Sequence, residues 1–408
     1  MRSSSTVVLA ATSLLVFAAF SLLALSAFKQ YTLPSLGLGP LQLQDPARGH
    51  NGNSSGGPRK FATPIGQWNG LFHPINLTVG TPPQRFNASI ELSSSAFFIP
   101  SISCDPYACM GRQEYSSNQS STYSPNGSYA SASYWAVRYT GILSQDTVSI
   151  AGVEIQNQMF EEYTDSHMIS IGGMDVGFDG MLGLAPPWSE EQNGEKYPNY
   201  LSLLMKEEKL EENVFSLRYP TTLEEQGELM LGGSNSNLYT GSFRNISLLP
   251  DDVDTPGLQG GWTVPLSSIT LNTPHPLHLP TPNYTAALVS EPLLILPTAF
   301  ARNITKIIGA EPFYLWLQSV PCDRRPYLPT LTFEIEGQEF TIDAWDYTFE
   351  WSFGMPEGSA PMCAVWIGES GDYGLGEGVV GLGTAFLKRW YSRWDFEGRR
   401  IGLAELKK

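Results

Sequence analysis

Apolar residues in this chain occur in short runs separated by turn-forming residues, and few stretches show the longer period of an amphipathic helix. The chain contains 39 glycines and 30 prolines, which interrupt the apolar runs at short intervals. Short apolar runs bounded by turn residues are typical of β-strands. We therefore predict a mostly β protein with a few short helices, such as one from Tyr200 to Leu210.

The length of the chain favours two lobes. Its 408 residues, 42% of them hydrophobic, exceed the size at which a single core usually stops growing. Residues 29–65 are rich in Gly, Ser, Asn and Pro and show no sustained apolar period, as expected for a flexible stem or propeptide. Arg59 and Lys60 near its end are either a processing site or a chance dibasic pair. We expect the structured body to begin near Gly66.

The amino terminus has the pattern of a secretory signal. Arg2 precedes an almost uncharged apolar run from Val7 to Phe28, which is typical of a signal peptide. Small residues offer a cleavage site, namely Ala24, Ser26 and Ala27. We therefore predict that residues 1–28 are a signal peptide. The run is also long enough for an uncleaved signal anchor, the one arrangement in which we expect membrane contact.

Eight Asn-x-Ser/Thr sequons support export, because such an accumulation is unusual in a cytosolic protein. They lie at Asn53, Asn76, Asn87, Asn118, Asn126, Asn245, Asn283 and Asn303. We predict a glycoprotein that is secreted or resides in the lumen of the secretory pathway or vacuole.

The formal net charge of -16 argues against a nucleic-acid partner, since a phosphate-binding surface needs clustered Lys and Arg. Four cysteines in an oxidising compartment predict two disulfides, with three possible connectivities. They are Cys104, Cys109, Cys322 and Cys363. A zinc site is disfavoured because no second close Cys pair or His pair accompanies the first two. We expect no metal and no cofactor.

The order of several motifs carries a family resemblance. In the first half they are Ile75–Phe86, Ser93–Pro100, Ser120–Tyr123, Thr140–Leu143, Asp146–Val148 and Phe178–Ala185. In the second half they are Gly227–Gly233, Tyr239–Gly241, Trp262–Leu271, Gly381–Tyr391 and Ile401–Ala404. In this order they resemble the pepsin family of aspartic peptidases, over roughly residues 66–405.

The resemblance implies a bilobal β fold with a cleft between the lobes. The lobes would span residues 66–243 and 244–408. It also implies a small disulfide loop formed by Cys104 and Cys109, and a pairing of Cys322 with Cys363.

The family's chemistry uses one aspartate from an Asp-Thr/Ser-Gly motif in each lobe, and the two carboxyls share a proton and hold a water. In the first lobe, Glu91-Leu92-Ser93 stands where this motif belongs. Glu91 keeps a carboxylate but extends it by on the order of 1 Å, which is enough to cost orders of magnitude in rate. Leu92 removes a bracing hydroxyl, and Ser93 adds a side chain where Gly allows close approach.

The second lobe offers no aspartate at the corresponding strand. Matching the apolar lead-in puts Ser290-Glu291-Pro292 on the motif, whereas aligning backwards from Pro297 puts Leu288 at the catalytic position. Either register loses the carboxylate. Pro292 also lacks the N–H that Gly supplies.

Two further residues bear on the site. Glu291 could pair with Glu91 in a replacement dyad, but neighbours on a strand point different ways, so we expect a structural contact between Glu91 and Ser290 instead. Tyr139 stands at the base of the expected flap, where it either contacts a ligand or packs within the hairpin; a glycine-rich flap tip is missing.

The leading hypothesis is therefore an exported, monomeric pseudo-peptidase whose cleft binds a peptide, protein or small molecule. The sequence leaves two alternatives: an aspartic-type endopeptidase with atypical catalytic residues, and an enzyme whose cleft serves different chemistry. Serine-hydrolase, zinc-peptidase and phosphate-loop motifs are missing from the sequence.

Overall fold

A computed structural model describes residues 59–67, 71–134, 137–168, 177–186, 191–192, 195–196, 198–222, 224–250, 261–314, 317–351, 358, 360–376 and 378–407. The chain separates into two units, residues 1–44 and 45–408, and all described residues belong to the second. The predicted signal peptide and Asn53 lie outside the described residues. The described part consists mainly of strands, which confirms the prediction of a mostly β fold.

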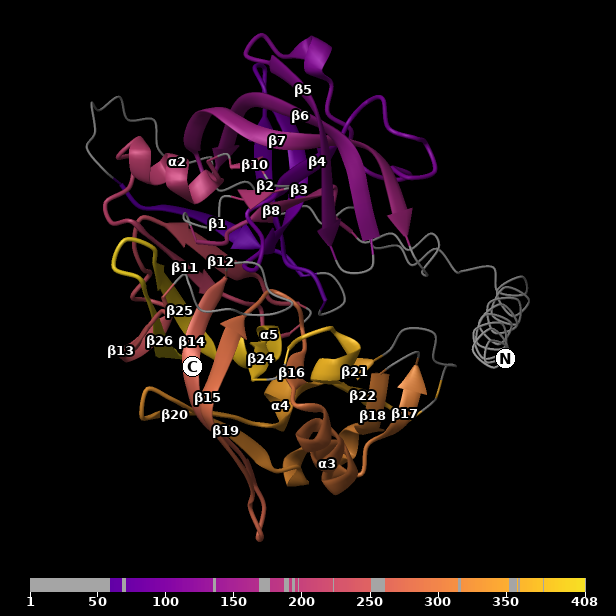
Figure 1. The fold of residues 1–408 in the computed structure, drawn as a ribbon, viewed down its shortest axis with the longest axis vertical. Helices are drawn as coiled ribbons and strands as arrows, with labels where there is room; N and C mark the ends of the chain where they lie inside the picture. Colours follow the sequence, from indigo (N-terminus) through magenta and orange to yellow (C-terminus); the bar gives the residue numbers. More distant parts are fainter. Residues whose placement is uncertain are drawn as a thin grey trace, which may run out of the picture. The chain divides into compact units, whose positions relative to one another are not determined.

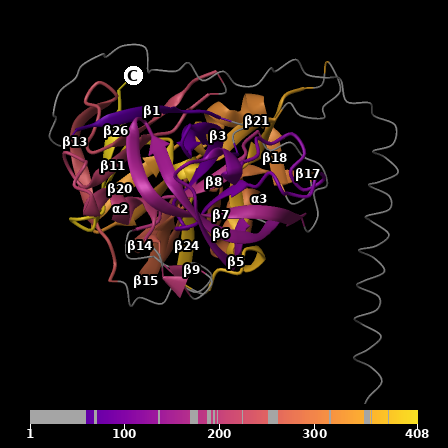
Figure 2. The same ribbon diagram turned by 90° about the horizontal axis from the view of Figure 1, so that it is seen from above.

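The first half of the chain forms a seven-stranded sheet, drawn in purple and magenta in Figure 1. Its strand order is β2 (Pro74–Val79), β3 (Gln84–Glu91), β8 (Gly180–Gly183), β4 (Phe97–Pro100), β7 (Val153–Met168), β6 (Val137–Ile150) and β5 (Ser124–Tyr134). Figure 2 gives a second view of the long strands β5, β6 and β7 that make one side of this sheet. A short two-stranded sheet joins β9 (Glu191–Gln192) and β10 (Glu195–Lys196).

The second half forms another seven-stranded sheet and a smaller four-stranded one. The order of the larger is β20 (Gln338–Ile342), β19 (Thr330–Ile335), β14 (Trp262–Asn272), β15 (Leu277–Leu288), β24 (Val379–Leu382), β16 (Leu294–Leu296) and β23 (Ile367–Glu369). The order of the smaller is β17 (Glu311–Tyr314), β18 (Leu317–Pro321), β22 (Met362–Val365) and β21 (Thr348–Trp351).

A six-stranded sheet draws strands from both halves of the chain. Its order is β1 (Phe61–Ile65), β12 (Gly227–Leu231), β11 (Val214–Arg218), β25 (Trp390–Asp395), β26 (Arg400–Leu406) and β13 (Tyr239–Ser247). Strand β1 pairs with β12 along its whole length. The structured body therefore begins before Gly66, and the last five residues of the expected stem 29–65 are a strand, because their backbone is paired and Ile65 is buried.

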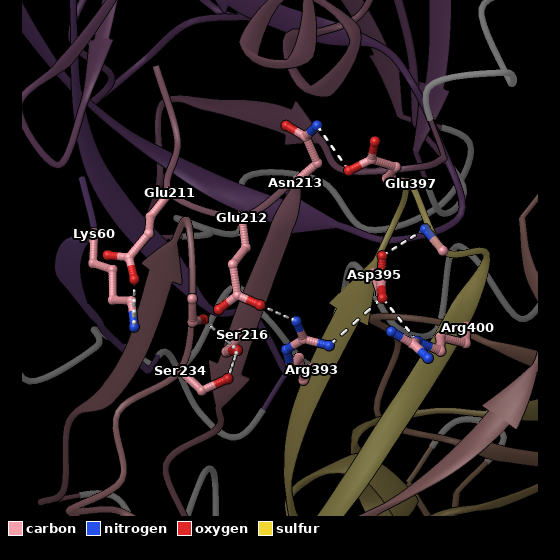
Figure 3. Close-up of polar contacts among 12 residues, drawn as sticks. Lys60, Glu211, Glu212, Asn213, Ser216, Ser234, Arg393, Asp395, Glu397 and Arg400 are labelled. Atoms are coloured by element: carbon pink, nitrogen blue, oxygen red, sulfur yellow. Dashed lines mark hydrogen bonds and ion pairs between the residues drawn. The ribbon is translucent and has the colours of Figure 1, made fainter. Parts of the chain in front are cut away.

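Ion pairs tie the parts of this sheet together (Figure 3). Arg393 on β25 lies 2.6 Å from Glu212, which precedes β11, and 3.6 Å from Asp395. The buried Asp395 carboxylate also accepts from Arg400 at 2.8 Å. Since β11 and β25 are neighbours, these contacts join chain segments almost two hundred residues apart.

The helices are short. They are α2 (Tyr200–Lys206), α3 (Thr298–Ile308), α4 (Ala344–Tyr347) and α5 (Thr384–Leu387), with 3-10 turns η1 (Ser117–Gln119), η2 (Cys322–Tyr327) and η3 (Ser370–Asp372). The helix expected from Tyr200 is present but ends at Lys206, four residues earlier than predicted, and the Asn199 side chain caps its start. Within the described ranges, no helix is both long and apolar enough to cross a lipid bilayer.

The core runs through both halves of the chain. Phe215 of β11 stacks on Trp394 of β25 with ring centroids 5.6 Å apart, and Trp262 of β14 meets Trp394 edge-on at 5.1 Å. The Trp262 indole N–H donates to the carbonyl of Leu184 at 2.9 Å. Both disulfides have the connectivity that the resemblance implied, Cys104–Cys109 and Cys322–Cys363.

Candidate active site

Two loops that follow corresponding strands form the candidate site. Strand β3 runs parallel to β8, with Ile90 opposite Leu182, and ends at Glu91. Strand β15 runs parallel to β24 in the same way, with Leu288 opposite Leu382. After each loop the chain returns to the same partner strand, with Phe97 opposite Leu182 and Leu294 opposite Leu382.

A glycine at the end of β8 and one directly after β24 let the loops approach closely. A β-carbon on Gly183 would lie 2.3 Å from the carbonyl oxygen of Ser94, and one on Gly383 would lie 2.1 Å from that of Glu291. The residues directly after the glycines differ, since the Leu184 N–H donates to Glu91 O and the Thr384 N–H to Glu291 O. Two residues after each glycine, the Ala185 N–H donates to Ser94 O and the Ala385 N–H to Pro292 O, which relates these two loop positions.

This relation corrects the register expected for the second loop. Because Ile90 corresponds to Leu288, Glu91 corresponds to Val289, which is 3% exposed. The position related to Glu91 is therefore neither Ser290 nor Leu288. The second loop is one residue shorter than the first between its two flanking pairings, so the two sequence alignments missed the position by one residue on either side.

Glu91 is buried, with only 1% of its surface exposed. Its Oε1 accepts hydrogen bonds from the Ser93 N–H at 2.8 Å and the Ser93 hydroxyl at 2.7 Å. Its Oε2 has no hydrogen-bond partner among the described residues. Burial raises the pKa of Glu91, and the N–H and hydroxyl donors around it oppose that rise. One carboxylate oxygen is thus turned back onto its own loop.

Ser290 braces the two loops. Its hydroxyl accepts a hydrogen bond from the Leu92 N–H at 3.0 Å, a contact between residues 198 positions apart. Glu91 and Ser290 are neighbours as expected, since the Ser290 backbone acts on the Glu91 carboxyl and opposes the rise of its pKa, while the Ser290 side chain forms the brace. Leu92 offers no hydroxyl for a reciprocal bond and instead packs fully buried in the core. Of the two reciprocal hydrogen bonds that would join the loops, only the one from the Leu92 N–H to the Ser290 hydroxyl is therefore present.

Glu291 lies near enough to Glu91 for the charge of one carboxylate to act on the other. Its side chain is half-buried, yet its Oε2 is enclosed and has no partner among the described residues. Burial, together with the neighbouring Glu91 carboxylate, raises the pKa of Glu291 to about 8. Between pH 4.5 and 8, Glu291 therefore keeps a proton that a solvated glutamate would release.

Two residues that no sequence motif indicated complete the surroundings. The fully buried Tyr219 phenol lies near Ser290, Glu91 and Glu291. Burial is the main cause that raises the pKa of Tyr219 above its usual range, and the charges of the two glutamates raise it further. The His73 ring meets the Tyr219 ring edge-on at 4.8 Å. Burial lowers the pKa of His73 to about 3, so its ring is neutral at physiological pH. Their positions after β11 and before β2 gave no pattern signal.

Tyr139 takes no part in this cluster of acids. It is 2% exposed on β6, stacks on Phe98 with ring centroids 4.3 Å apart, and meets the Tyr163 ring edge-on at 4.9 Å. Tyr139 pairs with Ala132 within the ladder of β5 and β6. Its burial and ring contacts favour packing over ligand contact.

The sequon asparagines within the described ranges lie at or near the surface. Asn87 is half-buried, and the remaining six are exposed: Asn76, Asn118, Asn126, Asn245, Asn283 and Asn303. Asn76 and Asn87 face each other across β2 and β3. Glycosylation of these residues remains a prediction.

The two carboxyls influence each other electrostatically, but no hydrogen bond joins them within the described residues, since the Oε2 atoms of both lack a partner and Glu91 Oε1 is bonded to Ser93. Glu291 corresponds to Ser93, two residues after Glu91, and an aliphatic side chain stands at the related position 289. Within the described residues, no group of three or more His, Cys, Asp or Glu side chains is arranged to hold a metal ion.

Comparison with known proteins places this site in context. The family model for eukaryotic aspartyl protease matches residues 73–406. Vacuolar protease A of Aspergillus fumigatus is 30% identical over 336 residues, covering 81% of this chain and 78% of that protein. Cathepsin D of Chionodraco hamatus is 31% identical over 341 residues, with 81% and 80% covered, and human cathepsin D is 30% identical over 356 residues, with 80% and 79% covered.

Proposed function

The chain belongs to the pepsin family of eukaryotic aspartyl proteases, with its bilobal fold, and from that premise we propose that it is a non-proteolytic member. The site that holds the acid pair in the family would here bind a peptide, protein or small molecule. The observation that carries this proposal is the buried Val289 at the position related to Glu91.

Val289 matters because hydrolysis in this family needs two carboxyls in close register around one water. An aliphatic side chain can neither accept a proton from that water nor hydrogen-bond it. Glu91 is also less able to bind a catalytic water, since its Oε1 already accepts two hydrogen bonds from Ser93. The loss of one acid and the engagement of the other together support a binding role.

The relatives also support a location. Two of them are named as a vacuolar protease and as cathepsin D. We place this chain in the lumen of the secretory pathway or vacuole, in agreement with its predicted signal peptide and sequons. Export from the cell remains the alternative within that route.

A second candidate is an acid endopeptidase that uses Glu91 and Glu291. One observation favours it, namely that the two carboxyls are close enough for Glu91 to raise the pKa of Glu291. Such a pair would share a proton, as the family's aspartates do. Its geometry would differ, because Glu291 projects from the position of the motif's third residue.

A proteolysis assay separates the two candidates. The purified chain is incubated with unfolded casein from pH 3 to 7, beside Glu91→Gln, Glu291→Gln and a transition-state-analogue inhibitor of aspartic peptidases, and products are identified by mass spectrometry. The proposal expects no peptides above those of a buffer control. Cleavage that the inhibitor and either substitution abolish would establish the endopeptidase instead. Cleavage that survives all three would reveal a contaminating peptidase.

A further inference from the structure

A cavity of about 310 Å³ lies where the six-stranded sheet meets the second seven-stranded sheet. It is bounded by β13, β25 and β26 on one side and by β19 and β20 on the other. None of its lining residues belongs to the candidate active site. We propose that this cavity is a binding site for a zwitterion of the amino-acid class, either a free amino acid or a short peptide.

Two residues that line the cavity carry buried N–H groups without acceptors among the described residues. Trp390 is 2% exposed, and its indole Nε1 has no hydrogen-bond partner among the described residues. The Nε atom of the adjacent Arg389 is also buried and also has no hydrogen-bond partner among the described residues. Both residues line the cavity. Buried donors are nearly always satisfied in native proteins, so two such donors at one cavity call for an acceptor from outside the chain.

A second guanidinium is fixed beside these donors. The Arg244 Cζ lies 4.1 Å from the centroid of the Phe340 ring and 4.8 Å from that of Trp390. One Arg244 nitrogen donates to the carbonyl of Glu339 at 2.6 Å. Another approaches the Glu405 carboxylate only to 3.9 Å, which is too far for a hydrogen bond. A carboxylate is the acceptor whose two oxygens best match such a set of planar N–H donors.

The acidic residues of the cavity lie toward solvent. Glu339 is exposed, and the Glu405 side chain is 57% exposed. Asp343 approaches Arg389 at 3.5 Å and caps helix α4 through the Trp345 N–H. The lining thus holds three acids and two arginines, so a simple anion would meet net repulsion. A ligand with an ammonium group next to its carboxylate would satisfy the buried donors and the exposed acids together.

Binding of glycine and glycylglycine to the full mature chain, measured by calorimetry and thermal shift, tests this inference. The two probes separate a free amino acid from a peptide as the preferred ligand. N-acetylglycine carries only the carboxylate and glycinamide only the ammonium group. We expect each of these controls to bind at least about tenfold more weakly than the better zwitterion, the loss typical of one interaction with a charged group. Equal binding of a zwitterion and N-acetylglycine, or no binding of any zwitterion, would overturn the proposal.

Two kinds of variant locate the site. Trp390→Phe removes the indole N–H but keeps an aromatic ring, and it should weaken zwitterion binding about tenfold. Trp345→Phe is the matched control, because Trp345 is exposed and does not line the cavity. If Trp390→Phe fails to fold, the double variant Glu339→Gln/Glu405→Gln, which changes two surface residues of the cavity, tests the same site. That pair should erase the preference for zwitterions over N-acetylglycine, and an unchanged preference would place binding elsewhere.

Discussion

The buried Glu161 makes a quantitative prediction about stability and pH. Its side chain on β7 is 0% exposed, and both carboxylate oxygens lack a partner among the described residues. Burial raises the pKa of Glu161 from 4.5 to about 8. Below pH 4.5 the group is protonated in both the folded and the unfolded chain. As pH rises from 4.5 toward 8, only the unfolded chain releases the proton, so the folded state loses stability.

The loss of stability at a given pH follows from how far that pH lies above 4.5 within the range from 4.5 to 8. Each pH unit in it costs about 1.4 kcal/mol of unfolding free energy per group. At pH 7 the cost attributable to Glu161 is therefore about 3 kcal/mol. Replacing Glu161 by Met, which has a similar length and no polar hydrogens, should remove this cost. We expect Glu161→Met to be about 3 kcal/mol more stable than the wild type at pH 7.

Urea denaturation at pH 4.5, 6, 7 and 8, followed by tryptophan fluorescence, measures the effect. The advantage of Glu161→Met should grow with pH through this range. Glu154→Met is the matched control, because Glu154 lies on the same strand but is exposed. A pH-independent difference between Glu161→Met and the wild type would refute the assignment of an unpaired, proton-binding carboxyl to this position.

Three further predictions concern the brace, a disulfide and processing. Ser290→Ala should destabilise the chain by about 1–3 kcal/mol, since it leaves the Leu92 N–H buried without an acceptor, whereas Ser290→Thr should retain stability in the same denaturation assay. Replacing Cys322 and Cys363 by Ala should cost about 3–4 kcal/mol, as expected for opening a loop of 41 residues; a thermal midpoint unchanged by the double substitution would contradict this. The protein from its native host should begin near residue 28 and shift in mass on glycosidase treatment, and an unglycosylated chain with an intact amino terminus would argue against export.

Much of the fold was predictable because its signals are local. Turn residues bounding short apolar runs indicated the strands, and the motifs around Gly183 and Gly383 kept the sequence order of the family. Strand β1 escaped prediction because it is a short edge strand directly after a polar segment, and its partner β12 lies more than 160 residues away. Pairing over such a distance leaves no periodic trace in the strand itself.

The candidate site was predictable only on one side. Glu91 follows from an ungapped match, so its position was found from the sequence. The related position in the second lobe was missed because the loop is one residue shorter, and the gap lies between the two anchors used for alignment. Only the pairing of Leu288 with Leu382 identifies Val289. The proximity of Glu291 and Tyr219 arises from packing between distant segments, which spacing along the chain does not encode.

The affinity for a transition-state-analogue inhibitor tests the central claim most directly, because such an inhibitor binds across both catalytic positions and needs no substrate sequence. Calorimetry would compare the wild type with Glu91→Asp/Val289→Asp/Glu291→Gly and with Glu91→Asp/Ser290→Asp. We predict no binding to the wild type, measurable binding to the first variant, which restores both acids, and none to the second, which places an acid at the brace. Tight binding to the wild type that Glu91→Gln abolishes would contradict the account.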